Sequence, residues 1–120
     1  MADRVLLVGD HPDEVDLLAL RLRGASYTVE VAPDARSALA AAPSYRPHYV
    51  VLEIGLPDLD GYELARRLRA TPGVESVWIV ALTGYASAEH RMRSLRAGIN
   101  VHLVKPAGVR AVIDAFTRLG

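Results

Sequence analysis

Short apolar runs alternate along this chain with longer stretches in which apolar residues recur at helical spacing. Apolar runs predict strands at residues 5–8, 50–52, 77–82 and 101–104, and residues 27–31 alternate like a strand with one more exposed face, which gives five strands. The stretches between and after them predict five helices, at residues 12–24, from 33–34 to near 43, 62–70, from 87 to about 97, and 108–119. The pattern is therefore a strand followed by a helix, repeated along the whole chain.

This order of elements indicates an α/β fold. Strands that are apolar throughout, joined by helical crossovers, are typical of a parallel sheet covered on both faces. Because such crossovers are right-handed, we expect a doubly wound, five-stranded sheet in a three-layer α/β/α sandwich. Ligands of these sheets bind outside the carboxyl ends of the strands, near the point where the strand order reverses.

Length and composition limit the kind of protein. With 120 residues we expect a single domain, residues 1–120, whose core needs no disulfide or metal. The formal net charge is zero, which argues against nucleic-acid binding through this domain, because phosphate binding needs a basic excess. There is no cysteine, no apolar signal segment, and no apolar stretch near the roughly 20 residues of a membrane span, so we expect a cytoplasmic protein with no membrane contact.

Polar residues follow four of the predicted strands. Gly9 and Asp10 come after the first, Glu53 after the third, Thr83 after the fourth and Lys105 after the fifth. Strands often end in polar residues by chance, but two acids, a hydroxyl and an ammonium at one edge of a sheet favour a functional site. Lys105 is also the single lysine among 14 basic residues, which indicates a need for a compact ammonium, although drift in an arginine-rich chain explains it too.

The segment around Glu53 (residues 50–61), together with Thr83-Gly84 and Lys105-Pro106, resembles the receiver domain of two-component response regulators. The resemblance runs in the same order over essentially the whole chain. It implies the flavodoxin-like strand order 2-1-3-4-5. In that family an aspartate at the end of the third strand accepts a phosphoryl group from a histidine kinase.

The resemblance assigns a role to each residue at this edge. Glu53 takes the phosphoacceptor position, and Thr83 and Lys105 take the positions that hold the phosphoryl oxygens. His102 falls at the position of the switch aromatic, although a surface residue on an edge strand is an equally good interpretation. Mg²⁺ would be bound by Asp10, Glu53 and the backbone carbonyl of Gly55. The resemblance also implies a cis peptide bond at Lys105-Pro106.

Two residues depart from the family pattern. The acceptor is Glu53 in place of aspartate, and Gly9 stands where the first of two acids is expected. One extra methylene moves the carboxylate by on the order of 1 Å, which can cost a hundredfold in rate. The missing acid weakens or removes the Mg²⁺ site, and phosphoryl transfer depends on positioning and charge neutralisation. Glu53 could instead imitate a phosphoaspartate, imperfectly, because a carboxylate has less charge and fewer oxygens than phosphate.

These departures make a degenerate receiver, or pseudo-receiver, the leading hypothesis. Such a module is not an enzyme. It acts by contact with a histidine kinase or an output domain. A second copy of the chain, bound through the fourth and fifth helices as a homodimer, is a further candidate partner. The alternatives are a working receiver that uses Asp10 or Glu53, an engineered phosphomimic, which Gly9 argues against, and a small enzyme, for which the sequence has no Ser-His-Asp or Cys-His pattern.

Other polar residues receive structural interpretations. Asp58 and Asp60 are expected to be turn residues before the third helix. The histidines lack metal-ligand spacing, and His11 next to Pro12 is interpreted as a loop residue. Two arginine clusters are interpreted as solvated helix faces; they are residues 66, 67 and 69 and residues 91, 93 and 96. An alternative for the cluster at 91, 93 and 96 is a docking surface on the fourth helix.

Overall fold

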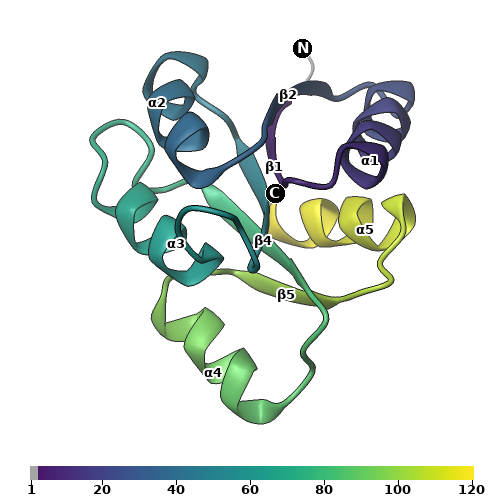
Figure 1. The fold of residues 1–120 in the computed structure, drawn as a ribbon. Coiled ribbons are helices and arrows are strands. Elements are labelled where there is room, and N and C mark those ends of the chain that lie inside the picture. The colour runs from purple at the N-terminus through teal and green to yellow at the C-terminus, as the bar shows by residue number, and fades with distance from the viewer. Residues whose placement is uncertain (1–2) are drawn as a thin grey trace.

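The computed structural model describes residues 3–120 and contains one parallel five-stranded sheet with the order β2-β1-β3-β4-β5 (Figure 1). All four strand pairings are parallel. The strands are β1 (Arg4–Val8), β2 (Thr28–Ala32), β3 (Tyr49–Glu53), β4 (Trp78–Thr83) and β5 (Val101–Val104). The helices are α1 (Pro12–Gly24), α2 (Ala35–Tyr45), α3 (Gly61–Arg69), α4 (Ala88–Arg96) and α5 (Val109–Leu119). The doubly wound architecture and its strand order are confirmed.

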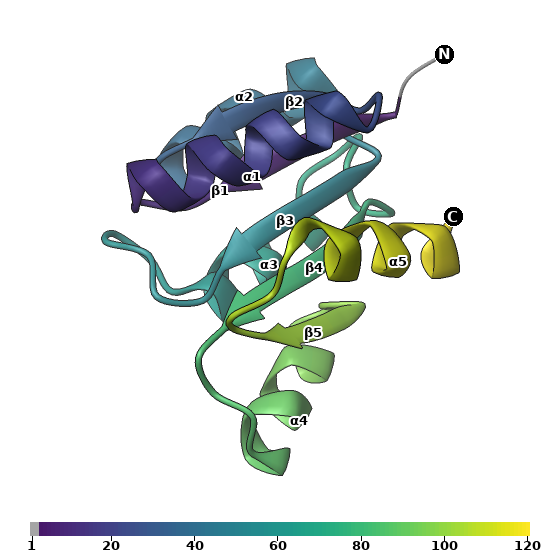
Figure 2. The same ribbon diagram turned by 90° about the vertical axis from the view of Figure 1, so that its right-hand side faces the viewer.

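The helices cover the two faces of the sheet and divide the core in two. Helices α1 and α5 lie on one face, which Figure 2 turns toward the viewer, and α2, α3 and α4 lie on the other. The α1/α5 core is centred on Phe116, whose ring stacks on that of Tyr49 at 4.2 Å between centroids. The core of the other face contains alternate residues of the same strands, including Leu6, Val50 and Ile79. Strands with both faces buried explain why the apolar runs of the sequence are continuous.

Capping side chains determine where three of the helices begin. Asp34 accepts a hydrogen bond from the amide of Ser37 at the start of α2, and Ser87 accepts one from His90 at the start of α4. Asp60 does the same for Glu63 in α3. Each cap satisfies a backbone donor that has no partner inside its helix.

The structure corrects two details of the sequence prediction. Helix α2 does not end near Pro43 but continues to Tyr45, because a proline so close to the end of a helix disrupts little of the remaining ladder. The apolar spacing of the predicted helix at residues 12–24 includes Leu17, yet this residue is 46% exposed, whereas Val15 and Leu22 are buried. Within residues 3–120 no helix has the length and apolarity that crossing a membrane requires.

Candidate functional site

The candidate site lies at the carboxyl edge of β1, β3, β4 and β5. The strand order reverses between β1 and β3, since β1 leads to β2 on one side and β3 continues on the other. Ligands of doubly wound sheets bind at this reversal. Glu53 is the last residue of β3 and Thr83 the last of β4, while Lys105 directly follows β5. The sequence prediction of a shared edge therefore agrees with the fold.

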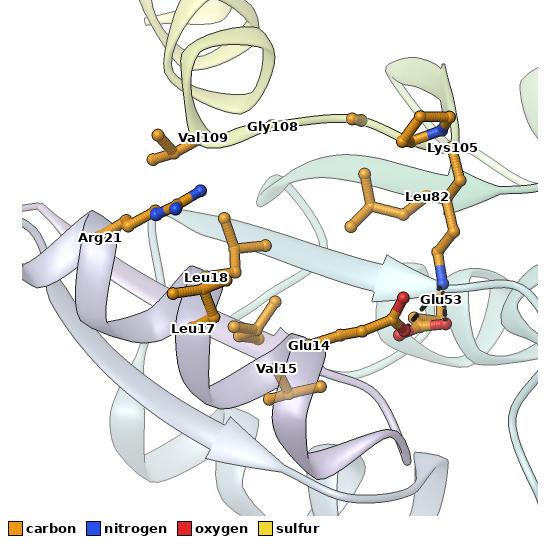
Figure 3. Close-up of a pocket in the computed structure, with 13 residues that line it drawn as sticks. Glu14, Val15, Leu17, Leu18, Arg21, Glu53, Leu82, Lys105, Gly108 and Val109 are labelled. Atoms are coloured by element: carbon orange, nitrogen blue, oxygen red, sulfur yellow. Dashed lines mark hydrogen bonds and ion pairs between the residues drawn. The ribbon is translucent and has the colours of Figure 1, made fainter.

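Glu53 and Lys105 form a short ion pair at this edge (Figure 3). Lys105 Nζ donates a hydrogen bond of 2.6 Å to Glu53 Oε2. The Glu53 side chain is 9% exposed and that of Lys105 is 30% exposed. Burial lowers the pKa of Lys105, but the hydrogen bond and charge of Glu53, helped by Glu14 at 3.6 Å, outweigh burial and raise that pKa above its ordinary value. The carboxylate at the acceptor position is therefore already neutralised by a cation of the chain itself.

Gly9 leaves the space that the Glu53 side chain fills. A Cβ atom at position 9 would lie 2.8 Å from Glu53 Oε1 and 3.2 Å from Glu53 Cγ. It would also lie 2.8 Å from Cγ2 of the buried Val15, so this side chain would have to shift as well. The two departures from the family pattern are thus sterically matched: the longer acid at position 53 occupies the room that a side chain at position 9 would need.

The turn after Glu53 is held close to the start of α3. The amide of Gly61 donates to the carbonyl of Ile54 at 2.7 Å. A Cβ at Gly61 would lie 2.7 Å from the Glu53 carbonyl oxygen, so only glycine permits this approach. Glu53 is consequently fixed at its backbone by the turn and at its carboxylate by Lys105.

Thr83 and His102 are linked to the segment that joins β4 to α4. The Thr83 hydroxyl oxygen accepts a hydrogen bond from the amide of Tyr85 at 3.2 Å. His102 Nε2 is 2.8 Å from the Tyr85 carbonyl oxygen, and its Nδ1 is 2.7 Å from the hydroxyl of Ser94, the buried residue of α4. Since a carbonyl only accepts, Nε2 carries the proton in this arrangement. His102 is therefore more than a surface residue of an edge strand, because it joins β5 to α4.

His11 and Glu14 lie beside the pair, although no functional role was predicted for either residue. His11 Nδ1 is 3.2 Å from Asp10 Oδ1, 3.8 Å from Glu14 Oε2 and 3.9 Å from Glu53 Oε2. His11, Glu14 and Glu53 form a group whose donor atoms all lie within 4.8 Å of one another. Asp10, expected in the metal site, is outside this group. Glu14 lies in the first turn of α1, three residues after His11, which is the only sequence signal that could have placed it here.

Asp58 and Asp60, expected to be turn residues before the third helix, both act as helix caps: Asp60 caps α3, and Asp58 caps the distant helix α2. Its carboxylate accepts hydrogen bonds from the amides of Ala35 at 3.0 Å and Arg36 at 2.9 Å, at the start of α2. Burial raises the pKa of Asp58, but these amides and that of Leu59 outweigh burial and lower it. The loop after Glu53 is thereby attached to α2. The predicted cis bond between Lys105 and Pro106 is present.

Comparison with known sequences gives one consistent result. A family model described as the response regulator receiver domain matches residues 5–117. An uncharacterised 14.6 kDa protein of Leptolyngbya boryana is 40% identical over 85% of this chain and 78% of its own length. The response regulator MprA of Mycolicibacterium vanbaalenii is 36% identical over 99% of this chain, which spans only 51% of that protein.

Solved structures agree. Chemotaxis protein CheY4 of Vibrio cholerae superposes with a TM-score of 0.95 at 27% identity, over 100% of both chains. The receiver domain of the sensor histidine kinase PA1611 of Pseudomonas aeruginosa has a TM-score of 0.89 at 31% identity, over 98% of this chain and 97% of that one. That receiver is described with a magnesium ion coordinated in its active-site cleft.

Proposed function

This chain belongs to the response regulator receiver domain family, and we propose that it is a degenerate receiver of two-component signalling, with a fixed charge at its acceptor position. A working acceptor must hold its carboxylate in the right position, and the charge that develops during transfer must be balanced. Phosphoryl transfer owes its rate almost entirely to positioning and electrostatic stabilisation, and both are altered at Glu53. The module then works by contact with other proteins and performs no catalysis of its own.

The observation that carries this proposal is the ion pair of 2.6 Å between Lys105 and Glu53. Lys105 takes the position that in the family holds a phosphoryl oxygen, and here it is bound to the acceptor carboxylate. To accept a phosphoryl group on Oε2, Glu53 would have to give up this contact, and Lys105 would have to move to the incoming oxygens. Close charge-assisted hydrogen bonds of this kind are among the stronger polar interactions in proteins.

The residues present do not suit Mg²⁺. Gly9 provides no side-chain oxygen, Glu53 is bound by an ammonium, and the nearby group of donors includes the imidazole of His11. Mg²⁺ prefers carboxylate, carbonyl and water oxygens in octahedral geometry, whereas imidazole suits transition metals. We therefore expect Mg²⁺ to bind weakly or not at all at the acceptor site.

A permanent Glu53–Lys105 pair supports one constant signalling state. The carboxylate carries one negative charge, compared with about −1.5 to −2 for a phosphate, so any imitation of the phosphorylated form is partial. Contact with a partner is expected through α4, where Met92 and Leu95 are exposed, the latter to 66%. Neighbouring arginines on α4, or a second copy of the chain meeting α4 and α5, would add to that interface.

Restoring the family residues tests the proposal. The parent chain, Gly9→Asp, Glu53→Asp and the double variant would each be incubated with acetyl phosphate and Mg²⁺ and weighed by intact-mass spectrometry. We expect a phosphoryl adduct only in the double variant, because Glu53→Asp alone still lacks the first acid and Gly9→Asp alone collides with Glu53. Glu89→Asp, which shortens an exposed acid in α4, is the matched control.

Two outcomes would contradict this reasoning. A stoichiometric adduct on the parent chain would show that Glu53 is a working acceptor. Labelling of Glu53→Asp as fast as that of the double variant would show that Gly9 is irrelevant to the loss.

A further inference from the structure

A cavity of about 390 Å³ lies between α1 and the connection from β5 to α5, beside the Glu53–Lys105 pair (Figure 3). This volume is within the range of small-molecule sites, roughly 300–1,000 Å³. Its lining is mainly apolar and comes from α1, β4 and the start of α5, with Leu18, Leu82 and Val109 as examples. Ligand sites typically combine such apolar walls with a few charged groups.

The charged groups of the cavity are divided between its two ends. At one end Lys105 is shared by Glu53 and Glu14, so two carboxylates face one ammonium. Figure 3 shows Arg21 at the other end, next to Val109, with apolar side chains of α1 in between. Within residues 3–120 the Arg21 guanidinium makes no hydrogen bond or ion pair in the structure. Arg21 is thus a cation available to a ligand, whereas Lys105 is already paired.

We infer that this cavity binds a small amphipathic carboxylate, with its acid on Arg21 and its apolar body against Leu18, Leu82 and Val109. A planar guanidinium matches the two oxygens of a carboxylate and binds them in a bidentate manner. The reverse orientation would bring the acid toward Glu53 and Glu14. A cationic ligand would meet the positive charge of Arg21 at one end or displace Lys105 at the other.

The volume sets the size of the ligand. At about 30 Å³ for each non-hydrogen atom, as in liquid water, the cavity holds roughly a dozen such atoms. The probe 4-phenylbutyrate has this size, and 4-phenylbutanol is its uncharged counterpart. This site does not depend on whether Glu53 accepts a phosphoryl group, so its test is independent of the phosphorylation assay.

The experiment is a titration of the full chain, labelled with ¹⁵N, with 4-phenylbutyrate, followed by backbone amide shifts. We expect saturable shifts confined to the amides around Leu18, Leu82 and Val109. Arg21→Gln should weaken binding about tenfold, since a charge-assisted hydrogen bond is lost. Arg96→Gln, a change of the same kind on the exposed face of α4, should leave the affinity unchanged, and Ala107→Phe should abolish binding by filling the cavity.

Three results would overturn the inference. The first is no saturable shift with 4-phenylbutyrate. The second is equal affinity for 4-phenylbutanol, which would remove the role of charge. The third is unchanged affinity in both Arg21→Gln and Ala107→Phe, which would place the probe elsewhere on the molecule.

Discussion

Breaking the Glu53–Lys105 pair from either side should have unequal effects on stability. Lys105→Met keeps most of the apolar stem and leaves the Glu53 carboxylate, 9% exposed, without its cation. Glu53→Gln leaves the Lys105 ammonium, which is 30% exposed and can turn toward water. The lysine substitution should therefore destabilise the fold more than the glutamate substitution does.

The magnitude follows from the geometry. Two unit charges 2.6 Å apart attract by about 6 kcal/mol at an effective dielectric constant of about 20. Desolvation of both groups offsets much of this, and loss of one partner of a fully buried pair costs about 3–5 kcal/mol. Because this pair lies at the rim of the sheet, we expect about 2–3 kcal/mol for Lys105→Met and about 1 kcal/mol for Glu53→Gln.

Urea unfolding of the parent, both single variants and the double variant gives the coupling energy as a double-mutant cycle. We expect a coupling of about 1–2 kcal/mol. Arg67→Met is the matched control, because Arg67 and Glu63 form an exposed pair at 3.1 Å, and such pairs contribute about 0.5 kcal/mol or less. If Lys105→Met costs no more than Arg67→Met, Lys105 does not hold the Glu53 carboxylate and the reasoning fails.

The same pair predicts a pH dependence with a definite sign. The pKa of Lys105 is raised in the folded state, so its contribution to stability is fully present below the unfolded value of 10.5 and is lost as pH rises through the folded pKa. The stability difference between the parent and Lys105→Met should therefore be constant near neutral pH and shrink at strongly alkaline pH. A difference that grows there would contradict the raised pKa.

Three further substitutions test other contacts. Asp58→Asn should destabilise the fold at pH 7 but progressively less in acid. The pKa of Asp58 is lowered in the folded state, so its carboxylate contributes stability that is lost as pH falls through that pKa. Unfolding measured at several acid pH values checks this, and a stability difference that does not depend on pH would contradict it. Arg69→Met should cost about 2 kcal/mol in urea unfolding, because it removes donors to backbone carbonyls of the loops that precede β4 and β5. An effect equal to that of exposed Arg66→Met would refute this. His102→Phe should leave the buried Ser94 hydroxyl unpaired and speed amide hydrogen exchange in α4, and unchanged exchange would show that His102 does not hold this helix.

Features determined by local sequence were predictable. The central strand β3 is buried on both faces, so its apolar run is nearly unbroken, and the residues that follow the strands were correctly expected at one edge of the sheet. The capping role of Asp60 follows from its place directly before α3. These features need only the chain neighbours of a residue and the general rule that parallel strands end at the same edge.

Features that depend on distances between elements were not predictable. His11 and Glu14 reach the acceptor position only because α1 begins beside the end of β3, and helical spacing alone cannot say how a helix is turned. Asp58 caps a helix 22 residues or more away in the sequence. The steric match of Gly9 and Glu53 depends on where a Cβ atom at position 9 would lie in the folded structure, and no sequence pattern gives that position.

The most direct measurement is the intact mass of the unmodified chain after incubation with acetyl phosphate and Mg²⁺, beside a receiver with aspartate at the acceptor position as positive control. We predict that the control gains a phosphoryl group and this chain does not, because Glu53 is bound to Lys105 and Gly9 supplies no metal ligand. A stoichiometric adduct located at Glu53 would contradict the fixed charge at the acceptor position.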